Sequence, residues 1–302
     1  MRFLAIGECM AELAPTASSD EYRLGFAGDT FNTAWYLARC APEVEVSYLT
    51  AVGDDTISEK MTAFMRDCGI RDDHVQVAAG KTVGLYLISL EQGERSFSYW
   101  RGQSAARALA SDAAALDAAM DEAELIYFSG ITLGILAPDD RATLLNALRK
   151  VRDAGKTIAF DPNLRPKLWT SDVEMTVATM QGATVSDLVL PSFEDEASWF
   201  KDANPKATAD RYHDAGARTA VVKNGAGPVF YSHRGVQGEI AVSPTDNLVD
   251  STAAGDSFNA GVFARYAAGA SLEEGIVYAC ALSRAVVQAR GALVPIDPQR
   301  LK

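Results

Sequence analysis

The stretch DSTAAGDSFNAG, Asp250 to Gly261, joins a run of small side chains to the start of a helix-forming pattern. The apolar pattern that starts at Phe258 predicts a helix beginning at about Gly255. Free backbone N–H groups and the positive end of the helix dipole would there face an anion with little side-chain obstruction. The stretch therefore predicts an anion site at a helix mouth, with the carboxylate of Asp256 just inside it.

Two interpretations of Asp256 are open from this stretch alone. An acidic residue in the first turn of a helix is common and mildly stabilising. A carboxylate beside an anion site also suits a base that takes a proton from a hydroxyl as the hydroxyl attacks a phosphate. The second interpretation needs support from the rest of the chain.

The composition is that of an ordinary globular protein, with 302 residues, 48% of them hydrophobic. The formal net charge of −12 argues against nucleic acid or an anionic membrane as partner, because both need an excess of Lys and Arg. The four cysteines and three histidines lack the spacing of a zinc site, which favours reduced thiols. With no signal peptide and no apolar run long enough to span a membrane, we expect a cytoplasmic protein.

Short apolar runs alternate with helical stretches along most of the chain. This alternation predicts a mostly parallel sheet covered by helices on both faces, whose ligands gather at the carboxyl ends of the strands. The predicted strands and the small or polar residues that end them are FLAIG (3–7), VSYLTAVG (46–53), LIYFSG (125–130), TIAFDPN (157–163), DLVLPS (187–192) and TAVVKNG (219–225).

Two segments break the alternation, at about 9–26 and 75–101. The first lacks a helical period, and the second contains two strand-like runs around a Gly-centred turn. We expect these segments to form a small β-sheet lid inserted in a single domain that spans residues 1–302. One face of such a lid needs cover, either from its own domain or from the lid of a second subunit.

Two familiar phosphate motifs, G-x-x-x-x-G-K-[ST] and a strand-linked G-x-G-x-x-G, are absent from the sequence. VDSTAAGDSFNAG instead resembles the C-terminal signature of the PfkB (ribokinase-like) carbohydrate kinases, D-T-x-G-A-G-D-x-F. AGDTFN, at 27–32, resembles their N-terminal signature, with Ala27 where the family has its first Gly. GECMAEL, VGDD, SGI, DPNLRP, KNGAG and GALVP then fall in family order over essentially the whole chain.

Within that family the chain is most similar to the 2-keto-3-deoxygluconate kinases. GECMAEL, AGDTFNTAWYLAR, YWR, DPNLRPKLW and DSTAAGDSFNAG carry this narrower resemblance. It implies a ribokinase-like α/β fold with an inserted lid, ATP and Mg²⁺ as cofactors, and a homo-oligomer formed through the lid. The implied reaction phosphorylates the C6 hydroxyl of a sugar acid. A fructokinase or ribokinase acting on a neutral sugar and a non-catalytic sugar-binding module are the alternatives.

The resemblance also implies roles for individual residues. Asp256 would be the catalytic base, and Ala253, Ala254 and Gly255 would supply the anion hole. The residues on the ATP side would be Asn163, Arg165, Lys223, Gly225 and Gly227, with Arg165 also neutralising the transferring phosphates. The residues that hold the sugar acid, besides Asp256, would be Gly28, Asp29, Asn32, Tyr86, Tyr99, Arg101 and Ile131.

Residue chemistry bears on some of these roles. An acidic protein needs a dedicated cation to bind a carboxylate, and Arg101 offers a planar bidentate fork. Asp29 and Asn32 could either cap a helix or bind sugar hydroxyls, and Asp29 could serve the cap alone. Asp161 suits a turn in which it accepts local backbone donors.

A metal-associated carboxylate is expected near PSFEDE, at 191–196, where the family has N-x-x-E. This sequence has Ser192 or Phe193 in place of the Asn. We expect Glu196 to be the counterpart of the Glu, reaching Mg²⁺ directly or through water, with Glu194 as the alternative. An acidic helix start would account for both residues equally well.

Overall fold

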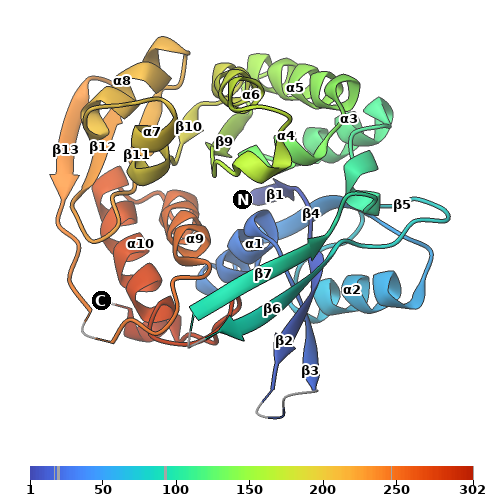
Figure 1. The fold of residues 1–302 in the computed structure, drawn as a ribbon. Helices are drawn as coiled ribbons and strands as arrows, with labels where there is room; N and C mark the ends of the chain where they lie inside the picture. The colour runs from blue at the N-terminus through green and yellow to red at the C-terminus, as the bar shows by residue number, and fades with distance from the viewer. Residues whose placement is uncertain (17, 19–20, 92–93, 246, 302) are drawn as a thin grey trace.

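The computed structural model describes residues 1–16, 18, 21–91, 94–245 and 247–301 (Figure 1). Its main sheet has nine strands in the order β13-β12-β11-β10-β9-β8-β1-β4-β5. All neighbours from β11 to β5 pair in parallel, and β12 and β13 extend the sheet as antiparallel strands, so the predicted parallel sheet is confirmed. The strands are β1 (Arg2–Ile6), β4 (Glu45–Val52), β5 (Val75–Val77), β8 (Leu125–Ser129), β9 (Thr157–Asp161), β10 (Leu188–Val189), β11 (Thr219–Val222), β12 (Val229–His233) and β13 (Val236–Ile240).

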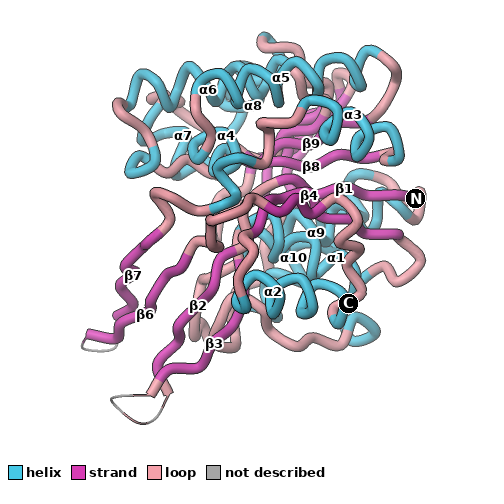
Figure 2. Tube along the Cα trace, turned by 90° about the vertical axis from the view of Figure 1, so that its right-hand side faces the viewer, coloured by secondary structure: helices cyan, strands magenta, loops and turns pink. Residues whose placement is uncertain are grey.

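Helices cover both faces of this sheet (Figure 2). One layer packs on a core cluster that includes Phe3, Tyr36 and Phe263, and the other on a cluster that includes Leu4, Phe128 and Phe160. The first layer is α1 (Asp29–Cys40), α2 (Thr56–Asp67), α9 (Ala254–Ala267) and α10 (Leu272–Val286). The second is α3 (Ala113–Glu122), α4 (Gly130–Ile135), α5 (Pro138–Asp153), α6 (Asp172–Thr184), α7 (Phe193–Trp199) and α8 (Pro205–Asp214).

Local sequence accounts for where many of these helices begin. The side chains of Asp55, Asp112, Ser171, Asn204 and Ser271 each accept a hydrogen bond from a first-turn amide of the helix that follows. No helix in the described part of the chain has both the length and the apolar character needed to cross a bilayer.

A second sheet of four strands projects from the main body as a lid (Figures 1 and 2). Its order is β3-β2-β6-β7, formed by β2 (Met10–Pro15), β3 (Tyr22–Ala27), β6 (Leu85–Glu91) and β7 (Glu94–Trp100). The expectation that the lid begins at about residue 75 is wrong, because β5 pairs with β4 at the edge of the main sheet. The expected Gly-centred turn falls on residues 92–93, which lie outside the described residues.

The carboxyl ends of β8, β9, β10 and β11 meet at one edge of the main sheet, because these strands are parallel neighbours. The D-P-N loop after β9 lies directly against the start of α4. A Cβ on Gly130 would lie only 1.8 Å from the carbonyl oxygen of Pro162. Glycine at position 130 therefore allows the close approach that fixes the course of this loop.

Replacing Gly130 with Ala should destabilise the protein by about 1–3 kcal/mol, because the methyl group must displace backbone rather than a flexible side chain. The matched control is Gly102→Ala, since no atom of the described chain, apart from the glycine and its two neighbours, lies within 4 Å of a Cβ at that position. Thermal unfolding should give a lower midpoint for Gly130→Ala than for Gly102→Ala. Equal midpoints would contradict the packing at this loop.

Candidate active site

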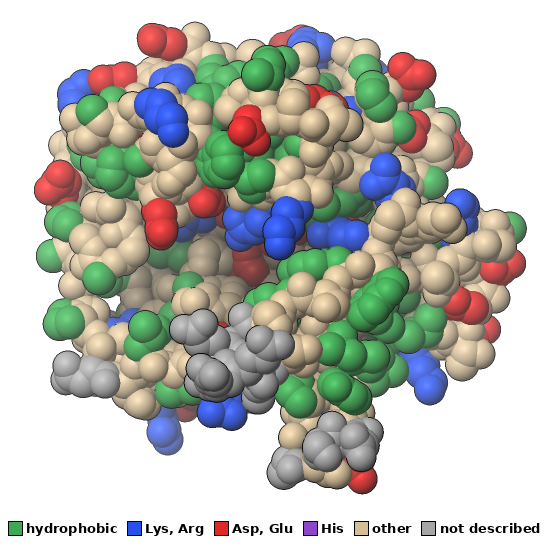
Figure 3. All heavy atoms as spheres, viewed as in Figure 1, with side chains coloured by type: hydrophobic (Ala, Val, Ile, Leu, Met, Phe, Trp, Pro, Cys, Tyr) green, Lys and Arg blue, Asp and Glu red, His purple; other side chains and the backbone are tan. Residues whose placement is uncertain are grey.

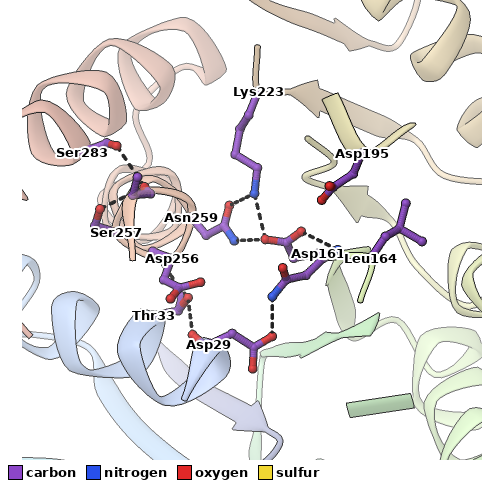
Figure 4. A network of polar contacts seen from close by, with 12 residues as sticks. Asp29, Thr33, Asp161, Leu164, Asp195, Lys223, Asp256, Ser257, Asn259 and Ser283 are labelled. Carbon is purple, nitrogen blue, oxygen red and sulfur yellow. Dashed lines mark hydrogen bonds and ion pairs between the residues drawn. The ribbon is translucent and has the colours of Figure 1, made fainter. Parts of the chain in front are cut away.

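The mouth of helix α9 faces the strand ends of β9 and β11 (Figure 4). The helix begins at Ala254, one residue before the predicted start. Ala253, which precedes it, has a left-handed φ of 59°, a conformation that costs an L-residue about 1–2 kcal/mol. The amide of Ala254 donates to the carbonyl of Ser251, at 3.2 Å. Within the described chain no acceptor meets the amides of Gly255 and Asp256, so these two N–H groups are available to an anion.

Gly255 keeps the helix mouth open toward the ammonium of Lys223. A Cβ at position 255 would lie 3.4 Å from Lys223 Nζ. Any larger side chain would fill the space between the ammonium and the helix mouth. The small residues therefore leave two kinds of positive group, backbone N–H and ammonium, facing one another.

Asp256 lies in the first turn of α9 with its carboxylate held by a single described side chain. Asn32 Nδ2 donates to Asp256 Oδ2 at 2.8 Å, and no described residue bonds Oδ1. Burial, followed by the nearby carboxylate of Asp29, raises the pKa of Asp256 to about 8, while the bond from Asn32 opposes the shift. A carboxylate with this pKa is suited to accept a proton near neutral pH.

The start of α1 brings Asp29 to the same site. Asn163 Nδ2 donates to Asp29 Oδ2 at 2.8 Å, which ties the D-P-N loop to the helix. Asp29 is the first residue of α1 and follows the N-cap Gly28, and no described side chain caps this helix, so the capping interpretation of Asp29 is wrong. Asn32 Oδ1 instead accepts a hydrogen bond from the amide of Gly28 at 3.3 Å. A Cβ on Gly28 would lie 2.1 Å from the carbonyl oxygen of Glu8, so only glycine fits there.

Asp161 has one local partner and two long-range partners, Lys223 and Asn259, on its two carboxylate oxygens. Oδ1 accepts from the amide of Asn163 at 3.1 Å, which confirms the expected turn. Oδ2 accepts from Lys223 Nζ at 2.8 Å, although the two residues are 62 positions apart. The loop after β9 is thus joined to the end of β11 by a largely buried ion pair.

Arg165 and Asp195 lie on the outer side of this ion pair. The guanidinium of Arg165 is half exposed, donates to the carbonyl of Leu164 at 2.7 Å and lies 3.6 Å from the carboxylate of Asp195. Figure 4 shows the carboxylate of Asp195 pointing toward Asp161. Burial raises its pKa, while Arg165 lowers it. The sequence analysis missed Asp195, although its position between the two candidate glutamates was a usable signal.

The structure does not bring Glu196 to the site. Its side chain is 0% exposed, and its carboxylate accepts from Arg211 Nη2 at 2.6 Å and from Tyr212 Oη at 2.9 Å. Both oxygens are therefore occupied inside the protein, which contradicts the expected contact with a metal, direct or through water. Glu194 is exposed, and no hydrogen bond or ion pair of its side chain to the described residues of the site is found. Asp195 is the carboxylate of α7 that faces the candidate phosphate site.

On the lid side, Arg101 follows β7 and pairs with Glu8, which follows β1. Both side chains are almost fully buried, so this ion pair joins the lid to the main sheet. Tyr86 on β6 donates to Glu12 on β2. Tyr99 on β7 is half exposed, and its ring lies tilted beside that of Tyr86 with the centroids 5.8 Å apart. The sequence analysis quoted Glu8 and Glu12 within GECMAEL but gave them no role.

The remaining predicted site residues lie around this centre. Ile131 is half buried in α4, next to Gly130 and the D-P-N loop. Gly225 and Gly227 form the turn after β11, closed by a hydrogen bond from the amide of Gly227 to the carbonyl of Asn224 at 2.8 Å.

Lysine and arginine side chains gather across this face of the molecule, with acidic side chains beneath them, in the hollow between the upper helices and the lid (Figure 3).

This arrangement supplies three chemical functions at one place. Two free amides and the Lys223 ammonium can meet an anion. The carboxylate of Asp256 can accept a proton beside that anion. The lid brings the guanidinium of Arg101 beside Glu8, where its remaining N–H donors can bind a second, different anion.

Comparison with known proteins gives a family match over nearly the whole chain. The pfkB family of carbohydrate kinases matches residues 2–299. The chain is 37% identical to the 2-dehydro-3-deoxygluconokinase of Haemophilus influenzae, covering 96% of this chain and 94% of that protein. It is 36% identical to the enzyme of the same name from Dickeya dadantii, covering 97% of this chain and 96% of that protein.

The fold is also similar to that of a solved kinase. A crystal structure of a fructokinase from Xylella fastidiosa with bound ATP superposes with a TM-score of 0.85, covering 97% of this chain and 94% of that one. The two sequences are 22% identical, so this likeness concerns the fold alone.

Asp256→Asn should make the protein more stable at alkaline pH. The carboxyl has a pKa of about 8 in the folded protein and an ordinary value near 3.8 in the unfolded chain. Its ionisation therefore costs stability progressively as the pH rises from about 4 to 8. We expect the variant to gain about 1 kcal/mol or more at pH 8, roughly 2–4 °C in the thermal unfolding midpoint, and little at pH 4. A gain that is the same at both pH values would contradict the shifted pKa.

Proposed function

The chain belongs to the pfkB family of carbohydrate kinases, and we propose that it transfers the γ-phosphoryl group of ATP to the C6 hydroxyl of 2-dehydro-3-deoxygluconate (2-keto-3-deoxygluconate). The observation that carries the proposal is the Asp256 carboxylate lying beside two free amides at the mouth of α9. The substrate follows from the relatives at 36–37% identity, which are named 2-dehydro-3-deoxygluconokinases.

In the proposed reaction, Asp256 Oδ1 accepts the proton of the C6 hydroxyl. The hydroxyl oxygen forms a bond to the γ-phosphorus as the bond between that phosphorus and the β,γ-bridging oxygen breaks, which gives the 6-phosphate and ADP. The proton remains on Asp256 until it is released to water. The amides of Gly255 and Asp256 and the ammonium of Lys223 stabilise the negative charge on the transferring group.

The donor groups of the site suit a magnesium ion that is bound mainly by nucleotide phosphates and water. No cluster of three or more His, Cys, Asp or Glu side chains that could hold a metal occurs in the described chain, whereas Asp195 supplies one partly exposed carboxylate beside Arg165. When bound, the ion would neutralise charge on the phosphates. Arg165, beside Asp195, would neutralise the outer phosphate oxygens.

Arg101 is the proposed ligand of the substrate carboxylate. A guanidinium carries five N–H donors, and the pair with Glu8 leaves donors for a second carboxylate. Tyr99, exposed on the lid strand that precedes Arg101, offers a ring and a hydroxyl to the sugar chain, whereas Tyr86 lies buried beside it with its hydroxyl bonded to Glu12. Closure of the lid over the substrate would exclude water, which could otherwise act as acceptor.

The alternatives are a kinase of a neutral sugar, such as fructose or ribose, and a non-catalytic sugar-binding protein on the same fold. ADP release should be measured with 2-dehydro-3-deoxygluconate, its galacto epimer, fructose and ribose. The proposal expects the highest kcat/KM with one of the two keto-deoxy acids, and favours the gluco form. A higher value with fructose or ribose supports the first alternative, and no sugar-dependent ADP release supports the second.

We further propose that the enzyme acts in the cytoplasm and forms a homo-oligomer through its lid. The reaction consumes ATP, and all four cysteines are free thiols, as in a reducing compartment. Large apolar side chains are exposed on two lid strands, namely Tyr22, Leu24, Phe97, Tyr99 and Trp100. Light scattering at micromolar concentration would oppose the oligomer if it gave the mass of one chain.

Replacement of Asp256 by Asn should lower kcat by at least about 10³-fold while leaving the affinity for ATP within about threefold, because the base is lost and the amides remain. In the wild-type enzyme, kcat/KM should rise with pH toward an inflection at about 8, where Asp256 loses its proton in the free enzyme. Steady-state kinetics between pH 6 and 9 measure both effects. A flat pH profile, or near-normal turnover by the variant, would exclude Asp256 as the base.

Arg101→Leu combined with Glu8→Gln should raise the KM for the sugar acid by about 10–100-fold, because a charged hydrogen-bonded contact is lost. The double change avoids leaving the Glu8 carboxylate buried and unpaired, which would itself destabilise the protein. Glu8→Gln alone is the matched control. An unchanged KM for the acid, with a normal melting midpoint, would remove Arg101 from the carboxylate site.

A further inference from the structure

We propose that Asn259 is a positioning residue that holds the ammonium of Lys223 over the mouth of α9, where the ammonium meets the phosphoryl group in transfer. This inference rests on the proposed kinase function and extends it to a residue that does not touch the substrates. Asn259 lies three residues after Asp256 on the same helix and is 0% exposed. The base and the proposed positioning residue are therefore neighbours on one helix face.

The side-chain amide of Asn259 has three hydrogen-bond partners, and Figure 4 shows the bonds to Lys223 and Asp161. Oδ1 accepts from Lys223 Nζ at 3.2 Å. Nδ2 donates to Asp161 Oδ2 at 2.7 Å and to the hydroxyl of Tyr127 at 3.2 Å. The carbonyl faces the ammonium and the NH₂ faces the carboxylate, and the flipped amide would oppose like groups. The orientation of the side chain is therefore fixed by its surroundings.

Lys223 completes a triangle with Asn259 and Asp161. Its Nζ donates to Asp161 Oδ2 at 2.8 Å as well as to Asn259, and an ammonium has three N–H donors. In the part of the chain that the structure describes, the third donor has no partner. Nζ is also 3.4 Å from where a Cβ on Gly255 would lie, so that donor is close to the helix mouth.

A single carboxylate would neutralise the ammonium of Lys223 but would not fix the position of its Nζ atom. The side chain of lysine has a flexible four-carbon stem and binds as a point charge, so one ion pair permits many positions of Nζ. The second contact, from α9 itself, places Nζ relative to the helix that also carries Asp256. Phosphoryl transfer depends on where positive charge lies as the group moves, so a displaced ammonium lowers kcat more than it lowers nucleotide binding.

The experiment compares Asn259→Leu with Tyr127→Phe. The first variant removes every polar contact of the amide at similar volume. The second removes one partner of Asn259 but keeps its bonds to Lys223 and Asp161, and should stay within about twofold of wild type. For Asn259→Leu we expect kcat to fall by about 10–100-fold, with the KM for ATP and the melting midpoint much less affected. Asn259→Ser, which is smaller, serves if the leucine variant does not fold.

A double-mutant cycle with Lys223→Met separates positioning from a purely structural role. If Asn259 acts through Lys223, Asn259→Leu should lower kcat by less than about threefold once Lys223 is absent. Full additivity of the two changes, or a folded Asn259→Leu variant with kcat within threefold of wild type, would overturn the inference.

A readout without the sugar acid keeps this test independent of the proposed substrate. Affinity for ADP alone and for ADP with aluminium fluoride, a mimic of the transferring phosphoryl group, is measured by calorimetry. We expect Asn259→Leu to lower the affinity for ADP with aluminium fluoride by about 10-fold or more and the affinity for ADP alone by less than threefold. Equal weakening of both would overturn the inference. Absence of keto-deoxy acid turnover in the wild type would instead count against the proposed substrate, and the kinetic cycle would then use the sugar that is accepted.

Discussion

Three hydrogen bonds between aspartate and asparagine side chains hold the acidic groups of the site together. They join Asn32 to Asp256 at 2.8 Å, Asn163 to Asp29 at 2.8 Å and Asn259 to Asp161 at 2.7 Å. An amide donates to a carboxylate without bringing a positive charge to it. Of the three carboxylates, Asp161 also has a cationic partner, the ammonium of Lys223. A cationic partner would instead have lowered the pKa of Asp256, which burial and Asp29 raise. The same bonds fix the relative positions of α1, α9 and the loop after β9.

A buried side-chain contact also attaches the lid to the main sheet. Glu8 follows β1 in the centre of that sheet, and Arg101 follows the outer lid strand β7. Their buried ion pair gives the lid a fixed attachment at the point where the substrate carboxylate is proposed to bind. Gly28 allows the start of α1 to pack closely against the backbone at Glu8, the residue to which the lid is attached through Arg101.

Much of the fold could be predicted from the sequence, but less of the candidate site could be predicted in the same way. Six strands of the main sheet, the start of α9 and the two-part lid follow from local patterns, with errors of one or a few residues. The antiparallel strands β12 and β13 were not predicted, and β5, which was expected in the lid, belongs to the main sheet. Local sequence patterns could not decide whether Glu196 or Asp195 faces the site. Successive side chains of a helix point in directions that differ by roughly 100°. An error of one residue in assigning the metal-associated carboxylate therefore exchanges a side chain that faces the site for one that faces the core. Glu196 points to Arg211 and Tyr212, and Asp195 points to the site.

The sequence by itself determined the alternation of strands and helices and the open mouth of α9, because periodicity and the absence of side chains are local properties. It also indicated that Asp256 lies at that mouth. Only the tertiary structure decided which partner each charged group has. Asn32 and Asp256 are 224 positions apart, Asn163 and Asp29 are 134 apart, and Asn259 and Asp161 are 98 apart. Such contacts exist only after the parallel strands have brought their carboxyl ends to one edge, because no local pattern fixes the distance between residues so far apart in the chain.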